Sequence, residues 1–395
     1  MTPAERRATF SLASIFGLRM LGMFIILPVF ALYADTLSGG HNRTLAGIAV
    51  GAYGLTQAIL QIPFGVLSDR WGRKPTLYIG LLIFALGSMI AAAADSIYMV
   101  IFGRIVQGAG AVSAVVIALV ADHTREEQRT KAMAIVGMTI GVTFALSMVA
   151  GPLLAHWIGV PGIFLMTGVL ALAACAVVRF LVPDGPALQG SPVRTPFLQV
   201  LVLPELVRLN YGIFVLHMVL TSLFVVVPFN LRDAGLPAGS HWEVYLSVML
   251  GAFVLMVPPM LWSERRGHQK AAFLGSIFLL TLGQVALYSA HAVWWIALAL
   301  LVFFTAFNLL EASLPSLVSR TAPPETKGAA IGVYSSVQFF GTFLGGALGG
   351  VISQHYGGNA VFLFCAALSA SWLVVAFRMR VPQKRSTPNL ASAET

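Results

Sequence analysis

Four ionisable side chains stand inside long apolar stretches of the sequence: Arg19, Arg104, His217 and Glu311. Charge is costly in an apolar environment, so such residues usually face a water-filled cavity or a charged partner. If the stretches are helical, Arg19, His217 and Glu311 each lie roughly 13 Å from the same end of their stretch. That is about half-way across the ~30 Å hydrocarbon core of a membrane. We therefore expect the four groups to line one central cavity.

Glu311 is the only acid placed deep in such a stretch. Apolar surroundings favour a protonated carboxyl, whereas a nearby cation favours the ionised form. A carboxyl under both influences can gain and lose a proton, as proton coupling requires. In the structural alternative, Arg19 holds Glu311 ionised, or a hydrogen-bonded network holds it neutral. Asn308, three residues earlier on the same helical face, could orient the carboxyl.

The other polar groups in apolar stretches admit two interpretations each. His217 is either a cavity residue or a satisfied packing residue, and the sequence does not separate the two. Tyr53 and Gln57 are candidates for the cavity wall, although most polar side chains in membrane helices bond neighbouring helices.

The composition identifies the elements that must position these groups. The chain has 395 residues, of which 58% are hydrophobic and 10% charged, against roughly a quarter charged in soluble domains. A spanning helix needs about 20 mainly apolar residues, and the sequence predicts an all-α membrane protein with twelve spans. The predicted spans are 10–34, 45–68, 75–94, 97–121, 131–155, 160–182, 208–230, 243–262, 271–291, 293–319, 328–353 and 358–379.

A stretch rich in Pro, Gly and Ser divides the spans into two sets of six. The predicted domains are a first bundle over 1–182, a cytoplasmic linker over 183–207, a second bundle over 208–380 and a polar tail over 381–395. The chain also begins like a helix, with Thr2 as cap, Pro3 at the first position and Glu5 three residues after the cap.

Basic residues predict the topology. If the N-terminus is cytoplasmic, Arg43 and Arg232 alone fall in outer loops and Arg19 and Arg104 fall within spans, which leaves 20 of the 24 basic residues in inner segments. This bias predicts a multi-pass protein with both termini in the cytoplasm. It also accounts for the net charge of +9 without a nucleic-acid partner.

The two predicted bundles echo one another in sequence. The stretch SDRWGR at 68–73 has a degenerate counterpart, SERRGH, 195 positions later, and TKAMAI at 130–135 is matched by TKGAAI 196 positions later. Two pairs of similar segments, separated by nearly the same number of residues, indicate a duplicated six-helix unit. Such duplication is typical of transporters built from parallel repeats.

The charged turn GVLSDRWGRK, residues 65–74, resembles the loop between helices two and three of the major facilitator superfamily. The residues that carry the resemblance are Gly65, Asp69, Arg70, Gly72, Arg73 and Lys74. The resemblance implies that Asp69 caps the helix beginning near Gly328, and that Arg73 pairs with Asp122. Both contacts are physically sound, because a carboxylate is favourable at a helix N-terminus and charge-assisted hydrogen bonds are strong. We expect this cluster to hold the halves together in the outward-facing state.

Two further motifs resemble those of the twelve-span drug:proton antiporter group. The run RIVQG from Arg104 resembles a pattern whose arginine is associated with proton transfer; alternatively, Arg104 is a buried cation satisfied by carbonyls. The fifth predicted span partly resembles the antiporter glycine signature, but Ser147, Ala155 and His156 replace three glycines. Many multidrug members place an acid on the first span, where this chain has Arg19, so a preference for cationic drugs is not carried over.

The resemblance implies a proton-coupled secondary transporter in a bacterial inner membrane that exports small amphipathic compounds. We expect protons, a small-molecule substrate and lipid as partners, a monomer, and no cofactor, metal or enzymatic activity. Proton-linked uptake or facilitated diffusion of a small metabolite is the alternative. A membrane enzyme is disfavoured, because the sequence has neither an HExxH metal motif nor a P-loop. Some members carry a soluble domain after the last span; none is expected after Pro382–Thr395.

Overall fold

The computed structural model describes residues 1–182, 200, 202–323 and 326–379. Within these ranges the chain is almost entirely helical and forms no strand, with one isolated β-bridge between Ser38 and Ser96. The predicted tail and most of the predicted linker lie outside the described residues. The linker was predicted to end at 207, whereas the helix of the second half already begins at Pro204.

The first half of the chain contains seven of the described helices. They are α1 (Pro3–Phe24), α2 (Leu27–Ala34), α3 (Arg43–Trp71), α4 (Arg73–Ala92), α5 (Ile97–Ala109), α6 (Ser113–Asp122) and α7 (Glu126–Phe180). The second half contains α9 (Pro204–Asp233), the 3₁₀ turn η1 (Ala238–Ser240), α10 (His241–Arg266), α11 (Gln269–Tyr288), α12 (Val293–Thr321), α13 (Lys327–Tyr356) and α14 (Gly358–Phe377).

These helices account for the twelve predicted spans. Eleven described helical segments are long and apolar enough to cross a membrane, and one of them, within α7, is 54 residues long and provides two crossings. The backbone of α7 leaves helical geometry at Gly159, whose φ is 69°, two residues before Pro161. The fifth and sixth predicted spans therefore meet at Gly159.

The first and fourth spans are each broken near the middle of the sequence that forms them. α1 ends at Phe24, four residues before Pro28, because the proline ring clashes with the carbonyl at that distance and offers no N–H. α5 ends at Ala109 and α6 begins at Ser113, after a glycine-containing turn. The chain therefore makes each of these spans from two short helices.

Equivalent turns in the two halves are made by glycines with positive φ. Gly72 (φ 98°) separates α3 from α4, and Gly267 (φ 70°), 195 residues later, separates α10 from α11. Gly159 divides α7, and Gly357 (φ 85°) separates α13 from α14. Positive φ is a conformation that glycine adopts at little cost. The structural repeat therefore agrees with the duplication that the sequence echoes indicate.

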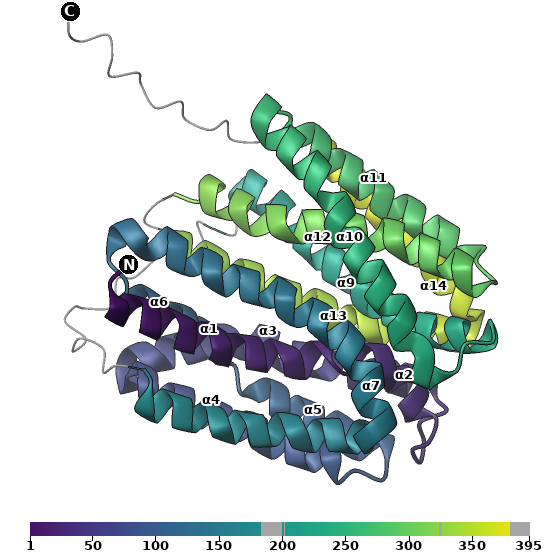
Figure 1. Cartoon of the computed structure of the whole chain (residues 1–395), viewed down its shortest axis with the longest axis horizontal. Coiled ribbons are helices and arrows are strands. Elements are labelled where there is room, and N and C mark those ends of the chain that lie inside the picture. Colours follow the sequence, from purple (N-terminus) through teal and green to yellow (C-terminus); the bar gives the residue numbers. More distant parts are fainter. Residues whose placement is uncertain (183–199, 201, 324–325, 380–395) are drawn as a thin grey trace, which may run out of the picture.

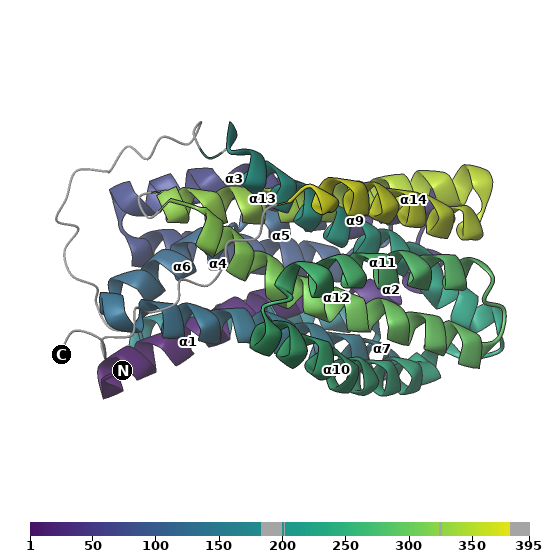
Figure 2. The same cartoon turned by 90° about the horizontal axis from the view of Figure 1, so that it is seen from above.

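The two halves touch at one end and diverge at the other. We call the end that carries residues 65–74 and the start of α1 the loop end, and the other the opposite end. Figure 1 shows the two groups of helices meeting near α2 and spreading toward the N-terminus, and Figure 2 shows the same helices from above.

Glycines on α3 and α13 explain the contact at the opposite end. A Cβ at Gly47 would overlap the carbonyl of Gly346, so two backbones can approach here only because both residues lack side chains. Gly65 and Gly328 lie 18 residues from Gly47 and Gly346, five full turns along the same helical faces. A Cβ at Gly328 would meet nothing within 4 Å, and one at Gly65 would meet only Ala114. α3 and α13 are therefore apart at the loop end.

The start of α1 is fixed as the sequence predicts. The Thr2 and Glu5 side chains cap the helix reciprocally. The Glu5 carboxylate also accepts hydrogen bonds from the backbone N–H and the guanidinium of Arg125, at 3.2 and 2.9 Å. This ion pair, which raises the pKa of the Arg125 guanidinium, ties the beginning of α1 to the turn before α7.

Candidate functional site

Arg19 is buried between the two halves. Its side chain extends from α1 and is 2% exposed. The guanidinium carbon lies 6.0 Å from the ring centroid of Tyr53 on α3 and 5.7 Å from that of Phe339 on α13. None of the three guanidinium nitrogens makes a hydrogen bond within the described part of the chain. The cation therefore lies near two aromatic rings, while its N–H groups have no hydrogen-bond acceptor among the described residues.

Arg104 shares the Tyr53 ring with Arg19 but has acceptors of its own. Its guanidinium carbon lies 4.9 Å from the ring centroid. One terminal nitrogen donates to the Gln107 amide oxygen at 2.5 Å and to the Gly22 carbonyl at 3.5 Å, and the other donates to the Val50 carbonyl at 3.4 Å. Both terminal nitrogens thus have neutral oxygen acceptors, as in the structural alternative for Arg104, whereas Nε has no hydrogen-bond partner within the described residues.

The rest of the RIVQG motif holds three helices together. The Gln107 amide donates to Ser88 on α4 at 2.8 Å, and Gly108 lets α5 approach the carbonyl of Tyr53. Gln57 donates to the carbonyls of Gly108 and Gly110, at 2.8 and 3.5 Å. Gln57 was predicted to line the cavity. Its amide N–H group instead satisfies carbonyls freed by the break between α5 and α6, because a broken helix leaves its last acceptors unpaired.

His217 and Glu311 form a second polar group in the other half. Their closest atoms, His217 Nε2 and Glu311 Oε2, are 3.9 Å apart. His217, 1% exposed, also lies 2.7 Å from the amide nitrogen of Gln338 on α13. Glu311 Oε2 is buried without a hydrogen bond. Arg19 makes no ion pair with Glu311 within the described residues, so the predicted structural pairing of these two is absent.

Two neighbours of Glu311 differ from expectation. Asn308 was predicted to orient the carboxyl, but its amide nitrogen makes no hydrogen bond, because one helical turn places the two side chains on one face without bringing their polar atoms together. Tyr334 on α13 was not predicted. Its hydroxyl is buried without a partner and interacts electrostatically with Glu311. Tyr334 and Gln338 are four residues apart, a helical spacing that could have indicated one polar face.

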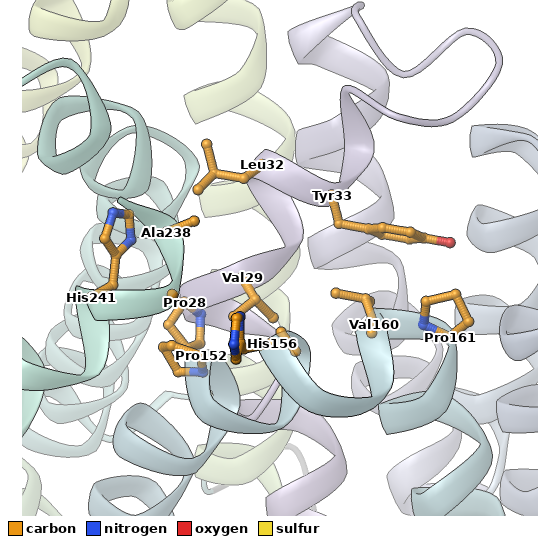
Figure 3. Close-up of a pocket in the computed structure, with 13 residues that line it drawn as sticks. Pro28, Val29, Leu32, Tyr33, Pro152, His156, Val160, Pro161, Ala238 and His241 are labelled. Atoms are coloured by element: carbon orange, nitrogen blue, oxygen red, sulfur yellow. The ribbon is translucent and has the colours of Figure 1, made fainter. Parts of the chain in front are cut away.

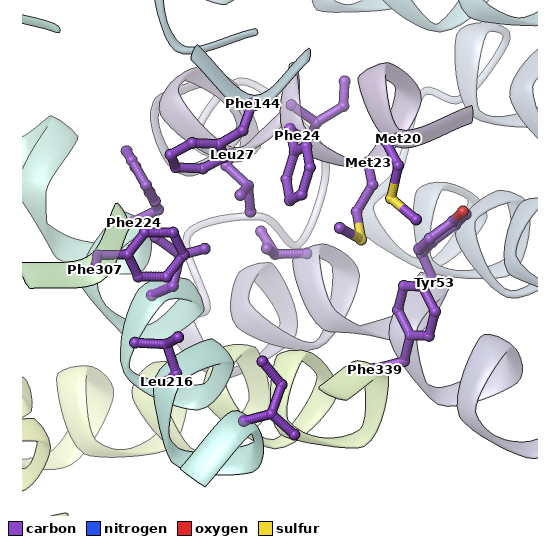
Figure 4. Packing of buried hydrophobic residues seen from close by; sticks show 14 of the residues in the cluster. Met20, Met23, Phe24, Leu27, Tyr53, Phe144, Leu216, Phe224, Phe307 and Phe339 are labelled. Carbon is purple, nitrogen blue, oxygen red and sulfur yellow. The ribbon is translucent and has the colours of Figure 1, made fainter. Parts of the chain in front are cut away.

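Adjacent residues on α13, about 100° apart around the helix axis, contact the two polar groups. Phe339 faces Arg19, and Gln338 faces His217. Between the halves lies an aromatic cluster in which Phe144 contacts Phe304 and Phe307, with centroids 5.9 and 5.5 Å apart. Figure 4 shows Phe144, Phe224 and Phe307 together, with Met20, Met23, Tyr53 and Phe339 grouped separately.

The loop motif makes one of its two predicted contacts. Arg73 Nε donates to Asp122 at 3.0 Å, as predicted. Asp69 pairs with Arg73 instead of capping α13, and the side chain of the N-cap residue Thr326 makes no capping hydrogen bond to that helix either. The reason is the separation of the helices at the loop end, which leaves Gly328 with no neighbour for an added Cβ. Arg70 is exposed, Gly72 makes the turn into α4, and Lys74 is partly buried.

A pocket of about 440 Å³ lies at the opposite end, between the halves. It is lined by α2, α7, η1 and α10 and contains none of the predicted site residues. Tyr33, His156 and His241 are its side chains with titratable groups, and Figure 3 shows them among prolines and aliphatic residues. Ala155 and His156, which replace glycines of the antiporter signature, form part of its wall.

Comparison with known proteins identifies the fold. The sequence profile of the Major Facilitator Superfamily matches residues 12–263 and 209–395. This chain is a member of the major facilitator superfamily. Within the superfamily it is 47% identical over 387 residues to the inner membrane transport protein YajR of Escherichia coli K12, covering 97% of this chain and 85% of YajR. The multidrug resistance protein MdtH of Proteus mirabilis is 26% identical and covers 84% of this chain and 82% of MdtH.

Solved structures of other superfamily transporters have the same fold. A bacterial homologue of the human lysosomal transporter Spinster, in an inward-facing and occupied conformation, superposes with a TM-score of 0.77 at 13% identity, over 95% of this chain and 97% of that one. A D-xylose–proton symporter superposes with a TM-score of 0.74 at 15% identity, over 95% and 98%. Family and fold neighbours are transporters, so the chain is a multi-pass membrane transporter.

Proposed function

We propose that this transporter couples the inward movement of protons to the export of small amphipathic compounds by alternating access. The observation that carries the proposal is Glu311, a mostly buried carboxyl on α12 that has one oxygen without a hydrogen bond. His217 is its only ion-pair partner among the described residues. A buried acid without a fixed counter-ion can change protonation as its surroundings change. Neither coupling nor direction follows from family membership alone.

The topology of the proposal follows from charge. The loop end carries Arg70, Arg73, Lys74 and Arg125, and we assign it to the cytoplasm, with both termini, because cytoplasmic loops are rich in Lys and Arg. With that orientation the described conformation is open toward the cytoplasm. The inner-membrane location of YajR, stated in its name, supports the same membrane here. We further propose a monomer composed of bundles 1–182 and 208–380, which moves substrate without a cofactor.

The transport cycle then has two positions of the halves. A compound enters from the cytoplasmic side while the outer ends of α3 and α13 are in contact. Proton exchange at Glu311 alters the interactions among α9, α12 and α13, and the halves rock about the central residues. A membrane potential favours proton entry by about 2.3 kcal/mol per 100 mV, a useful drive for this movement. Asp69 caps α13 in the outward-facing position, when the loop ends meet.

The test is flux in proteoliposomes that contain the purified protein. With the cytoplasmic face outward, an inside-acid pH gradient should drive uptake of exported compounds into the vesicles, and collapsing the gradient should abolish it. The alternative, proton-linked uptake or facilitated diffusion of a metabolite, predicts accumulation by expressing cells instead of exclusion. Gradient-independent equilibration of the same compounds would contradict the coupled mechanism.

A further inference from the structure

The unsatisfied cation Arg19 is the feature that the proposed transport cycle does not use. Its Nε, Nη1 and Nη2 atoms are all buried and have no hydrogen-bond partner within the described residues. A guanidinium has five N–H donors, and a buried charge is tolerated when it is paired. The rings of Tyr53 and Phe339 stabilise the positive charge, but the N–H groups make no hydrogen bond. These donors are left for a ligand.

The surroundings of Arg19 are positive and lack a counter-ion. Arg104 lies against the same Tyr53 ring, and its hydrogen-bond acceptors are the neutral oxygens of Gln107, Gly22 and Val50. Neither arginine forms an ion pair with a carboxylate in the part of the chain that the structure describes. The buried acid Glu311 lies beside His217 in the second half and makes no ion pair with either arginine among the described residues. Two buried cations without an anion produce a field that attracts one.

The walls next to Arg19 indicate the rest of the ligand. Met20, Met23, Tyr53 and Phe339 lie together (Figure 4), and two of them, Tyr53 and Phe339, are the rings that lie near the Arg19 guanidinium. Methionine and aromatic side chains pack against apolar groups of varied shape. An anion with an apolar body fits both features, whereas a free inorganic anion would leave the apolar wall unused. The Tyr53 hydroxyl, which is buried without a partner, is a further donor for the anionic group.

We propose that Arg19 binds the anionic group of the substrate, so that the compounds transported are small amphipathic carboxylates or sulfonates. The inference rests on the proposed function, because it names the substrate class for the same central site. A guanidinium binds a carboxylate through two parallel hydrogen bonds, which orients the apolar part of the ligand toward the methionines. The same position would repel amphipathic cations.

The experiment compares acids with amides of the same shape. Thermal unfolding of the purified wild-type protein is measured with indole-3-acetate and indole-3-acetamide, naphthalene-1-acetate and its amide, and benzoate and benzamide, at about pH 7.5, where carboxylates are ionised. At least one acid should stabilise the protein at a concentration about tenfold or more below that of its amide, as expected for a charge-assisted pair. Equal stabilisation within every pair overturns the inference. So does stabilisation by chloride or phosphate equal to that by the acids.

Substitutions test whether Arg19 causes the preference for acids over amides. Arg19→Gln should abolish the preference for acid over amide, and Arg19→Lys, which keeps the charge, should retain part of it. Arg232→Gln, which removes an exposed arginine paired with Asp233, is the matched control and should change nothing. An unchanged preference in Arg19→Gln overturns the inference. If that variant does not fold, the acid and amide pairs on the wild-type protein still decide the question.

Measuring transport of the same compounds in proteoliposomes shows whether the anion site or the proposed proton-coupled export is wrong. If the acids bind preferentially but no pH gradient drives their movement in proteoliposomes, the anion site stands and proton-coupled export is wrong. If a gradient drives the movement of amides or amines and no acid binds preferentially, coupled export stands and the anion site is wrong.

Discussion

At the scale of the residue, the two halves bury charge of opposite kinds. Arg19 and Arg104 lie in the first half around Tyr53, whereas Glu311 lies in the second half beside His217. Arg104 donates to neutral oxygens through both terminal nitrogens, whereas its Nε has no partner within the described residues. Arg19 and Glu311 each retain polar atoms without partners. Buried polar groups are normally hydrogen-bonded, so we propose that a transported species is the partner of these two residues.

Replacing Glu311 by glutamine tests proton coupling at this scale. The amide keeps the shape of the side chain but cannot exchange a proton, so we expect substrate equilibration without dependence on the pH gradient. The measurement is flux in proteoliposomes with and without the gradient. Glu243→Gln, at an exposed acid in the first turn of α10, is the control and should remain coupled. Unchanged proton dependence in Glu311→Gln would remove Glu311 from the coupling role.

At the scale of the element, glycines decide which helices touch. α13 uses Gly345 against Met218 of α9 and Gly346 against Gly47 of α3. Each approach brings backbone against backbone, which any side chain would prevent. Small residues allow such contacts in membranes, where packing between helices drives association. The same helix carries Gly332, where an added Cβ would meet nothing within 4 Å.

Two alanine substitutions on α13 should therefore have opposite effects. Gly346→Ala places a Cβ on the Gly47 carbonyl, and we expect overpacking to destabilise the described conformation by about 1–3 kcal/mol. Gly332→Ala meets open space and should be neutral or stabilise by up to ~1 kcal/mol through helix propensity. Thermal or denaturant unfolding in detergent gives both values. An equal loss in the two variants would contradict the assignment of the α3 contact.

At the scale of the whole molecule, one end of the bundle is closed and the other is open. The described conformation has α3 and α13 in contact near Gly47 and apart near Gly65, with Asp69 turned to Arg73. Rocking between halves that pivot about the centre must reverse this pattern. Asp69 would then reach the N-terminus of α13, where a carboxylate is stabilised by about 0.3–2 kcal/mol.

Asp69→Asn should shift the population toward the conformation open at the loop end. The measurement is made in a Cys175→Ser background with a cysteine introduced at Gly332. This cysteine should react faster with a maleimide when Asp69 is asparagine than when it is aspartate, because the conformation closed at the loop end then loses the carboxylate that caps α13. Asp233→Asn, at an exposed acid of the opposite end, is the control. If Asp69→Asn leaves both the labelling rate and transport unchanged at normal expression, the switch role is wrong.

The sequence by itself determined the class of fold and the number of spans. These properties follow from the lengths of the apolar stretches, from the distribution of Arg and Lys between loops, and from the similar segments 195 and 196 residues apart. None of these features depends on tertiary contacts. The loop motif also predicted the Arg73–Asp122 pair, because the two residues are held by helices of one half. Arg19, Arg104, His217 and Glu311 were recognisable as buried charges for the same reason: their cost is set by the surrounding apolar residues.

Only the tertiary structure decided what those charges touch. The sequence predicts Gln57 as a candidate for the cavity wall, but in the structure its amide donates to the Gly108 carbonyl at a helix break 51 residues away in sequence. The four buried groups separate into two sets because Phe339 and Gln338, adjacent on α13, point to different neighbours. A side chain's partner depends on the rotation and tilt of its helix, which small-residue contacts between helices fix. Local sequence sets which residues are buried, and packing sets which of them meet.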